Sequence, residues 1–109
     1  MKRIKLKIEK VSDGTIVVKH TTSKLNSVAL YNDIYNNIEG VIRVAQGNDG
    51  YAFYIHKANE LFNFNIDIIP EVMRLIVQQL PNDYFVVIRQ PNIIVDSSNY
   101  KNVILESEL

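Results

Sequence analysis

Two β-prone runs separated by a short glycine-containing segment most constrain the fold of this chain. Residues 41–45 and 51–55 are rich in β-branched and aromatic residues. The segment between them, Gln46-Gly-Asn-Asp-Gly50, supplies the residues that tight hairpin turns require. The two runs are therefore predicted to pair as antiparallel strands, which places a β-sheet at the centre of the fold.

Two helices are predicted around this hairpin. Apolar residues recur every three or four positions from Leu25 to Ile38, which indicates a helix that Thr22 or Ser23 caps and that ends at Gly40. Asparagine is frequent on its polar surface and is a weak helix former, so this helix is expected to depend on tertiary packing. A second helix is predicted over residues 70–80, with a proline in its first turn and another directly after it.

The remaining strands are predicted from alternation and from β-branched content. Apolar residues alternate with charged ones over residues 4–8, the period of a half-buried strand. Further strands are predicted at residues 15–20, 84–88, 93–95 and 100–105, and residues 58–67 are ambiguous. The expected fold is α+β, with an antiparallel sheet of five to seven strands, two helices on one face and the approximate order ββαββαββ. Its length of 109 residues fits one compact domain, residues 1–109.

Composition limits where the chain works and what it binds. Hydrophobic residues make up 47% and charged residues 22%, which is typical of a globular protein. The chain has no cysteine, which excludes disulfides and thiolate zinc sites and suits the cytoplasm. The sequence lacks the long apolar run of a signal peptide or a membrane span, so we expect a soluble protein without membrane partners.

Charge is balanced overall but uneven along the chain. The formal net charge is zero, which argues against a generally cationic nucleic-acid-binding protein. Residues 1–24 nevertheless hold seven Lys or Arg against two Asp or Glu. We interpret the lysines as solubilising residues on an exposed N-terminal edge strand, which would discourage pairing with other chains. The same edge alternatively offers a route to a homodimer with a continuous sheet.

One strand suggests nucleic-acid binding. The run Gly50-Tyr-Ala-Phe53 is similar to the RNP1 strand of RNA-recognition-motif domains, and the element order over residues 15–88 is the βαββαβ of that family. Asp49 stands where that family has a basic residue. The resemblance implies a single-stranded nucleic-acid-binding domain, for which the candidate residues are Tyr51, Phe53, Lys5, Lys7 and Lys19. It requires Tyr51 and Phe53 to be exposed; alternatively Phe53 belongs to the core and Tyr54 faces solvent.

Signatures of catalysis are absent from the sequence. It contains no phosphate-binding glycine loop, no nucleophile elbow and no cluster of metal ligands, so we predict no catalytic residues, no metal and no cofactor. His20 and His56 each end a predicted strand and leave open a metal-free phosphoesterase. We expect a non-enzymatic protein.

Docking on another protein is the predicted function. Tyrosine is favoured at interface hot spots, and Tyr31 and Tyr35 lie one turn apart on the first predicted helix. The acidic candidates Asp33, Glu39 and Asp49 are able to mimic nucleic-acid phosphates. About a quarter of the chain is Ile or Asn, which indicates an A/T-rich genome. A phage or mobile-element product that inhibits a host or defence protein, as anti-CRISPR proteins of similar size do, fits these features; in that case it works in the host cytoplasm.

Overall fold

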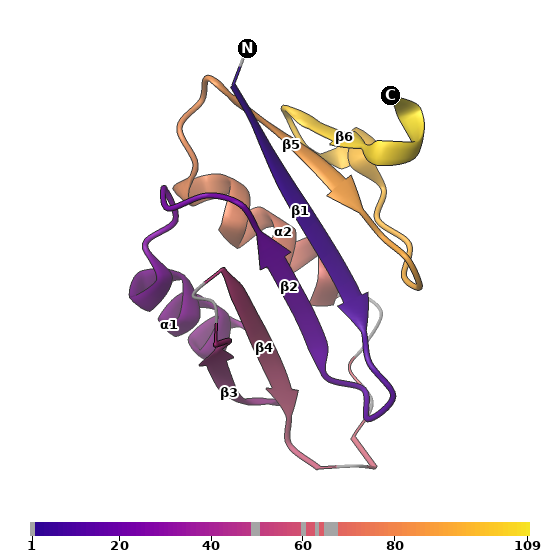
Figure 1. Cartoon of the computed structure of the whole chain (residues 1–109). Helices are drawn as coiled ribbons and strands as arrows, with labels where there is room; N and C mark the ends of the chain where they lie inside the picture. Colours follow the sequence, from indigo (N-terminus) through magenta and orange to yellow (C-terminus); the bar gives the residue numbers. More distant parts are fainter. Residues whose placement is uncertain (1, 49–50, 60, 63, 65–67) are drawn as a thin grey trace.

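One mixed sheet and two helices form the structure, a computed structural model that describes residues 2–48, 51–59, 61–62, 64 and 68–109 (Figure 1). Its regular elements, in chain order, are β1 (Lys2–Lys10), β2 (Ile16–His20), α1 (Ser27–Asn37), β3 (Val41–Gln46), β4 (Ala52–Lys57), α2 (Ile68–Gln79), β5 (Tyr84–Arg89), η1 (Ser97–Asn99), β6 (Val103–Leu105) and η2 (Glu106–Glu108). The α+β class is confirmed, as is the hairpin that β3 and β4 form.

The sheet has six strands in the order β3-β4-β2-β1-β5-β6. The pairs β1/β2, β2/β4 and β3/β4 are antiparallel, whereas β1/β5 and β5/β6 are parallel. The prediction of a purely antiparallel sheet is therefore wrong. It assumed that strands pair with their neighbours along the chain, but β1 pairs with a strand that follows it by 82 residues, and β6 returns beside β5 through a crossover.

The N-terminal strand is central rather than at an edge. β1 pairs with β2 through residues 6–10 on one side and with β5 through residues 2–7 on the other, so it lies inside the sheet. Its residues Ile4, Leu6 and Ile8 are buried in the core, which explains why this strand lies in the middle of the sheet. The N-terminal strand is therefore not an edge strand, so the structure does not offer the edge that the expected homodimer requires.

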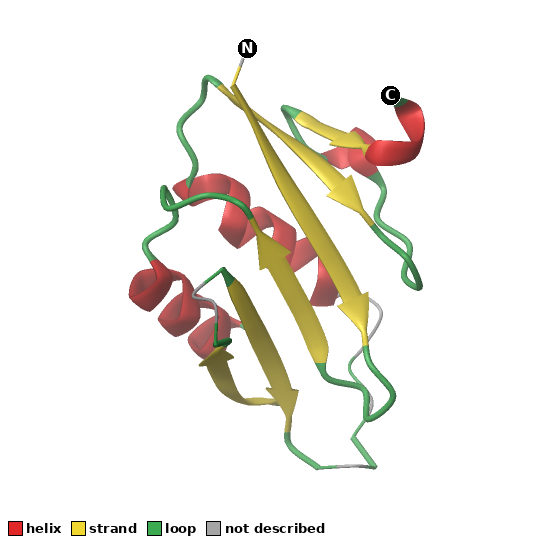
Figure 2. Ribbon diagram, viewed as in Figure 1, coloured by secondary structure: helices red, strands yellow, loops and turns green. Residues whose placement is uncertain are grey.

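The two α-helices pack against one face of the sheet, and neither covers the other face, where the short η2 contacts β5 and brings Glu106 near Arg89 (Figures 1 and 2). Alternation decides which residues reach the core: on β1 and β2 the even-numbered residues face the helices and the odd-numbered ones face outward. The core consists mainly of Ile, Val and Leu from the strands and helices, with Phe53 and Met73 fully buried among them. We call the face that α1 and α2 leave uncovered the open face.

The first helix begins later than the sequence predicts. Asn26, not Thr22 or Ser23, is its N-cap, and its side-chain oxygen accepts a hydrogen bond of 3.2 Å from a backbone N–H in the first turn. Leu25 and Leu30, directly before the cap and in the second turn, are both buried in the core. These two leucines hold the start of α1 against the sheet.

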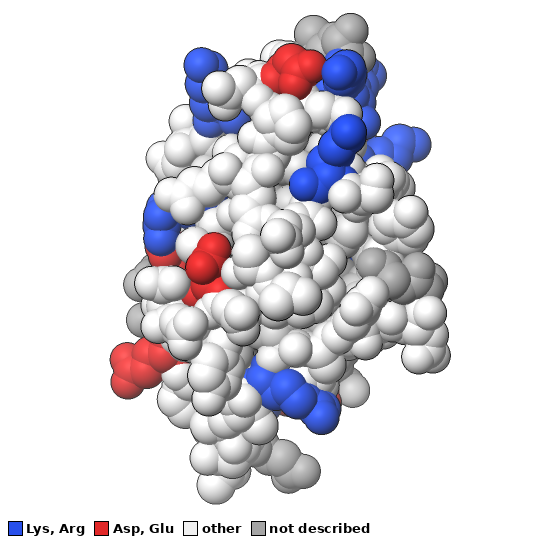
Figure 3. Space-filling model, turned by 90° about the vertical axis from the view of Figure 1, so that its left-hand side faces the viewer, with Lys and Arg blue, Asp and Glu red and all other residues white. Residues whose placement is uncertain are grey.

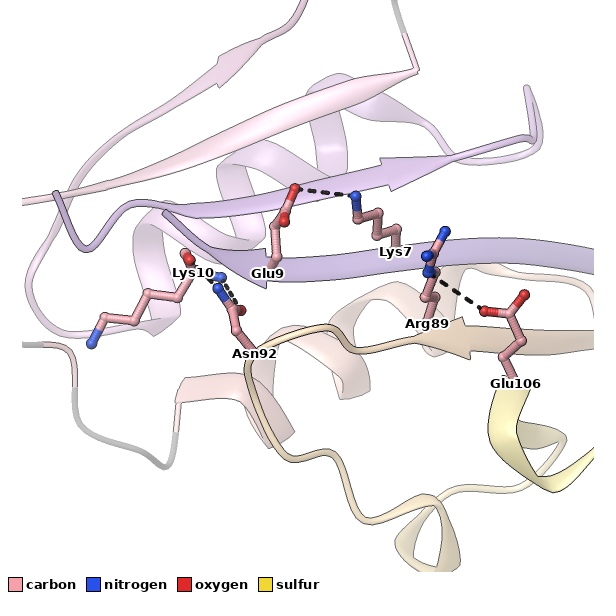
Figure 4. A network of polar contacts seen from close by, with 6 residues as sticks. All are labelled: Lys7, Glu9, Lys10, Arg89, Asn92 and Glu106. Carbon is pink, nitrogen blue, oxygen red and sulfur yellow. Dashed lines mark hydrogen bonds and ion pairs between the residues drawn. The ribbon is translucent and has the colours of Figure 1, made fainter. Parts of the chain in front are cut away.

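The C-terminal part departs from the prediction at one segment. Residues 93–95 form no strand, although Val95 is buried in the core. A preceding residue, Asn92, binds the end of β1: the backbone N–H of Lys10 donates to Oδ1 of Asn92 (2.9 Å), and Nδ2 of Asn92 donates to the carbonyl of Lys10 (2.5 Å) (Figure 4). The predicted edge strand at residues 100–105 is confirmed as β6, which is shorter.

Candidate binding surfaces

One candidate surface lies where α1 packs beside β3 at an edge of the sheet. Of the two candidate tyrosines on α1, Tyr31 packs inward, with its ring centroid 5.2 Å from that of Phe53. Tyr35 points outward and is 53% exposed. Val28, seven residues before Tyr35 and thus on the same side of the helix, is 70% exposed. Asn32 lies between them on the helix surface and is also exposed, so this side of α1 presents an apolar, an aromatic and an amide side chain to solvent.

The strand next to this helix adds a free edge. Among the strands that the structure describes, β3 pairs with β4 alone, so one row of its backbone N–H and C=O groups faces outward. A register shift between Val41 and Arg43 interrupts the ladder, and Ile42, at this irregularity, is 54% exposed. We call Val28, Tyr35, Ile42 and the outer edge of β3 the α1–β3 surface.

Few charges interrupt this side of the molecule. Figure 3, which looks at the side where α1 and β3 lie in Figure 1, shows a broad area without charged residues and with isolated acidic and basic groups around it. Of the predicted acidic candidates, Asp33 lies on α1 and Glu39 follows its end, and both are exposed. Asp49 lies outside the described residues. The structure thus places Tyr35, Asp33 and Glu39 on or beside one helix and turns Tyr31 toward the core.

Phe53, an aromatic residue of the RNP1-like strand, faces the helices. Phe53 is fully buried (0% exposed), and its ring lies close to those of Tyr31 and His20. Tyr51 directly precedes β4 and is 46% exposed, with its ring at 5.8 Å from that of His20. Phe53 cannot stack on a base without leaving the core. The alternative arrangement is the one observed, because Tyr54 is partly exposed on the opposite face.

The candidate lysines lie on the open face, away from Phe53. Lys5 and Lys7 project from β1, and Lys19 is the direct cross-strand partner of Lys7. Arg89, which sequence reasoning missed, is the partner of Lys7 on the other side. Arg89 comes beside Lys7 only through the long-range pairing of β1 with β5, and no local pattern in the sequence indicates this pairing. The predicted nucleic-acid residues are therefore divided between the two faces of the sheet.

A shallow hollow lies among these basic side chains on the open face. Its volume is about 270 Å³, and Lys5, Lys7, Lys19 and Arg89 line it together with a single carboxylate, Glu106. Lys7 forms an ion pair with Glu9 (3.6 Å) and Arg89 one with Glu106 (3.8 Å), both at the surface (Figure 4). The backbone N–H of Lys5 donates to Oγ1 of Thr21, another residue of the lining.

The two histidines do not form a catalytic pair. His20 is buried on the helix side of β2, whereas His56 lies on the open face of β4 beside the ring of Tyr54. Burial, followed by the nearby positive charge of Arg43, lowers the pKa of His56 below its ordinary value of 6.5, and Asp13 opposes this shift. Within the described residues, no three His, Cys, Asp or Glu side chains are grouped closely enough to hold a metal ion.

Comparison with known proteins gives no relative from which a role for either surface could be inferred. No family model, curated protein or solved structure matches this chain. In the part of the chain that the structure describes, neither helix has the length and apolar character needed to cross a membrane.

Proposed function

We propose that the chain is a non-enzymatic binding protein that docks on another protein through the α1–β3 surface and thereby modulates it. The observation that carries this proposal is the exposure of Val28 and Tyr35 on α1, which packs against β3, together with the exposed Ile42 on β3, a strand that pairs only with β4 among the described strands. A tyrosine buries a large amphipathic area at low entropic cost, which makes Tyr35 the first candidate for the centre of the interface.

Two modes of contact are available on this surface. A partner strand can add to the free edge of β3, where main-chain hydrogen bonds supply affinity that does not depend on sequence. The exposed side chains of α1, which packs against β3, then supply selectivity through Val28 and Tyr35. Asp33 and Glu39 fit the polar rim that surrounds the apolar centre of an interface. In this proposal they contact basic residues of the partner and mimic phosphates there.

The composition supports a source and a mode of action for such a protein. An Ile- and Asn-rich chain of 109 residues suits the A/T-rich genome of a phage or mobile element. In this proposal the protein acts by covering the working surface of a larger one. We therefore place the partner among host or defence-system proteins, and the binding event in the host cytoplasm.

The test is retention of a partner by the immobilised protein. We expect the wild type to retain a protein from host lysate, and the Tyr35→Ala/Ile42→Ala variant to lose it. Removing a hot-spot tyrosine costs about 2 kcal/mol or more, roughly a 30-fold loss of affinity. The affinity for the identified partner is then measured by calorimetry.

The control variant also loses an exposed apolar side chain, but at a position outside the α1–β3 surface. Ile94 is 87% exposed in the segment after β5, so Ile94→Ala is expected to bind as the wild type does. The circular dichroism spectra of all variants should match. Equal retention by the Tyr35→Ala/Ile42→Ala variant would remove the α1–β3 surface as the interface, and the absence of any retained protein would overturn the docking proposal.

A further inference from the structure

The open face of the sheet concentrates positive charge although the whole chain is neutral. Four basic residues and one acidic residue line the hollow, and the chain has a formal net charge of zero. Lys7 stands directly between Lys19 on β2 and Arg89 on β5. Neighbouring strands lie about 4.8 Å apart, so three cations share a row about 10 Å wide.

Placing these cations side by side costs stability unless an anion offsets them. Like charges directly opposite each other on a sheet repel and destabilise it. Glu9 and Glu106 compensate Lys7 and Arg89 in part, through ion pairs that are partly exposed and therefore weak. Lys5 and Lys19 have no carboxylate within ion-pair distance among the described residues. The face is thus suited to an anion that supplies several negative charges.

The shape of the positive area favours a chain-like anion. Arg3, Lys5 and Lys7 occupy alternate positions of β1 on the open face and extend the area along this strand. The four residue steps from Arg3 to Lys7 span about 13 Å, which is longer than a single phosphate group. Aromatic rings flank this strip on the same face, with Tyr54 on β4 and Phe85 on β5, and both are partly exposed.

We propose that the open face binds single-stranded nucleic acid. The sugar–phosphate backbone lies along β1, in contact with Lys5, Lys7, Lys19 and Arg89, and unpaired bases rest against Tyr54 or Phe85. In a duplex the faces of the bases are stacked on each other, so they are not accessible for stacking on these rings. This activity is separate from the docking proposed above, because it uses the other face of the sheet and different residues.

The first measurement is the salt dependence of binding. Fluorescence anisotropy of a labelled mixed-sequence single-stranded RNA is recorded as the protein is added at 50 mM and at 200 mM salt. Contact with about four phosphates gives a slope of roughly −3 for log K against log salt, which is roughly a 50-fold loss of affinity between the two conditions. Absence of binding at 50 mM salt, or an affinity that is the same at both salt concentrations, would overturn the proposal.

A matched pair of variants separates the site from overall charge. Lys5→Gln/Lys19→Gln removes two cations of the hollow, and Lys24→Gln/Lys101→Gln removes two exposed cations that do not line it. Both variants change the net charge by the same amount. We expect the slope to fall by about 1.4 in the first and to stay unchanged in the second. Equal weakening in both would show that only general electrostatics acts and would overturn the site.

Protein stability and the form of the nucleic acid supply two further readouts. The unfolding midpoint of Lys5→Gln/Lys19→Gln at low salt should equal or exceed that of the wild type, because repulsion on the open face is relieved. Weaker binding is then not due to unfolding. A duplex of the same sequence should compete less well than the single strand, and stronger competition by the duplex would overturn the preference for unpaired bases.

Discussion

At the scale of single residues, the side chain of Asn92 bonds to the backbone of Lys10 as a neighbouring strand would, although Asn92 is not in a strand. Its amide makes both backbone hydrogen bonds to Lys10 and so continues the contact between β1 and the segment after β5. Backbone groups at the end of a strand otherwise form hydrogen bonds with water, and such bonds do not hold the chain in one position. One side chain thereby fixes where residues 90–95 leave the sheet.

Replacing Asn92 with alanine should destabilise the fold. Two hydrogen bonds are lost, each worth about 1 kcal/mol or less where water can replace the partner, so we expect a loss of about 1–2 kcal/mol. Urea unfolding followed by circular dichroism measures it. Asn36→Ala is the control, because this exposed position on α1 gains a better helix former and should be neutral or slightly stabilised. Similar effects of the two substitutions would show that the amide of Asn92 is dispensable.

His56 offers a second residue-scale prediction. The pKa of its imidazole lies below the ordinary value, so the unfolded chain binds the proton more readily than the folded one. The contribution of His56 to stability should therefore fall as the pH drops below about 6.5. Titration followed by NMR of the His56 ring gives the pKa directly.

Removing the neighbouring guanidinium tests the cause of that shift. In Arg43→Gln the pKa of His56 should rise part of the way to 6.5, because the repulsion disappears while the burial remains. A wild-type pKa at or above 6.5 would contradict both the geometry and the sign of the effect.

At the scale of elements, β1 holds the two halves of the sheet together. The antiparallel strands β2, β4 and β3 lie on one side of it, and the parallel strands β5 and β6 lie on the other. Strand β2 therefore meets β5 only through β1. A destabilising substitution in β1 therefore weakens both halves of the sheet, whereas one in β3 weakens only an edge strand.

Truncating one core residue of β1 should therefore be severe. Leu6 is buried to 2% exposure, and Leu6→Ala is expected to cost about 2–5 kcal/mol, a large share of the stability of a domain this size. Ile42→Ala, on the edge strand, should cost under about 0.5 kcal/mol because its side chain is already half in water. Denaturant midpoints of the two variants check this ranking, and comparable losses would contradict the central role of β1.

The same elements show what a single sequence can reveal. The β3–β4 hairpin and α2 were predicted because their signals are local: turn residues, helical spacing and prolines at the helix ends. The place of β1 was missed because alternation of charged and apolar residues fits an edge strand and a central strand equally well. In β4, alternation separated Phe53 from Tyr54 but could not tell which face the helices cover. Arg89 joined the lysines only through the parallel pairing of β5.

At the scale of the whole molecule, the two candidate surfaces differ in chemistry as well as in position. The α1–β3 surface combines exposed apolar and aromatic side chains with few charges, while the open face is basic and flanked by aromatic rings. Salt should weaken binding on the first only modestly, by screening the rim charges Asp33 and Glu39, and should weaken binding on the second steeply. Any dimer with a continuous sheet must use β3 or β6, the two end strands of the sheet.

The central place of β1 also has a consequence during synthesis on the ribosome. β1 is translated 82 residues before the strand that completes it, which is a delay of about 4–16 s at ordinary elongation rates. Throughout that delay the nascent β1–β2 hairpin has an unpaired flank. The lysines and arginine that alternate along β1 then act as gatekeepers, because charged side chains discourage the flank from pairing with another nascent chain.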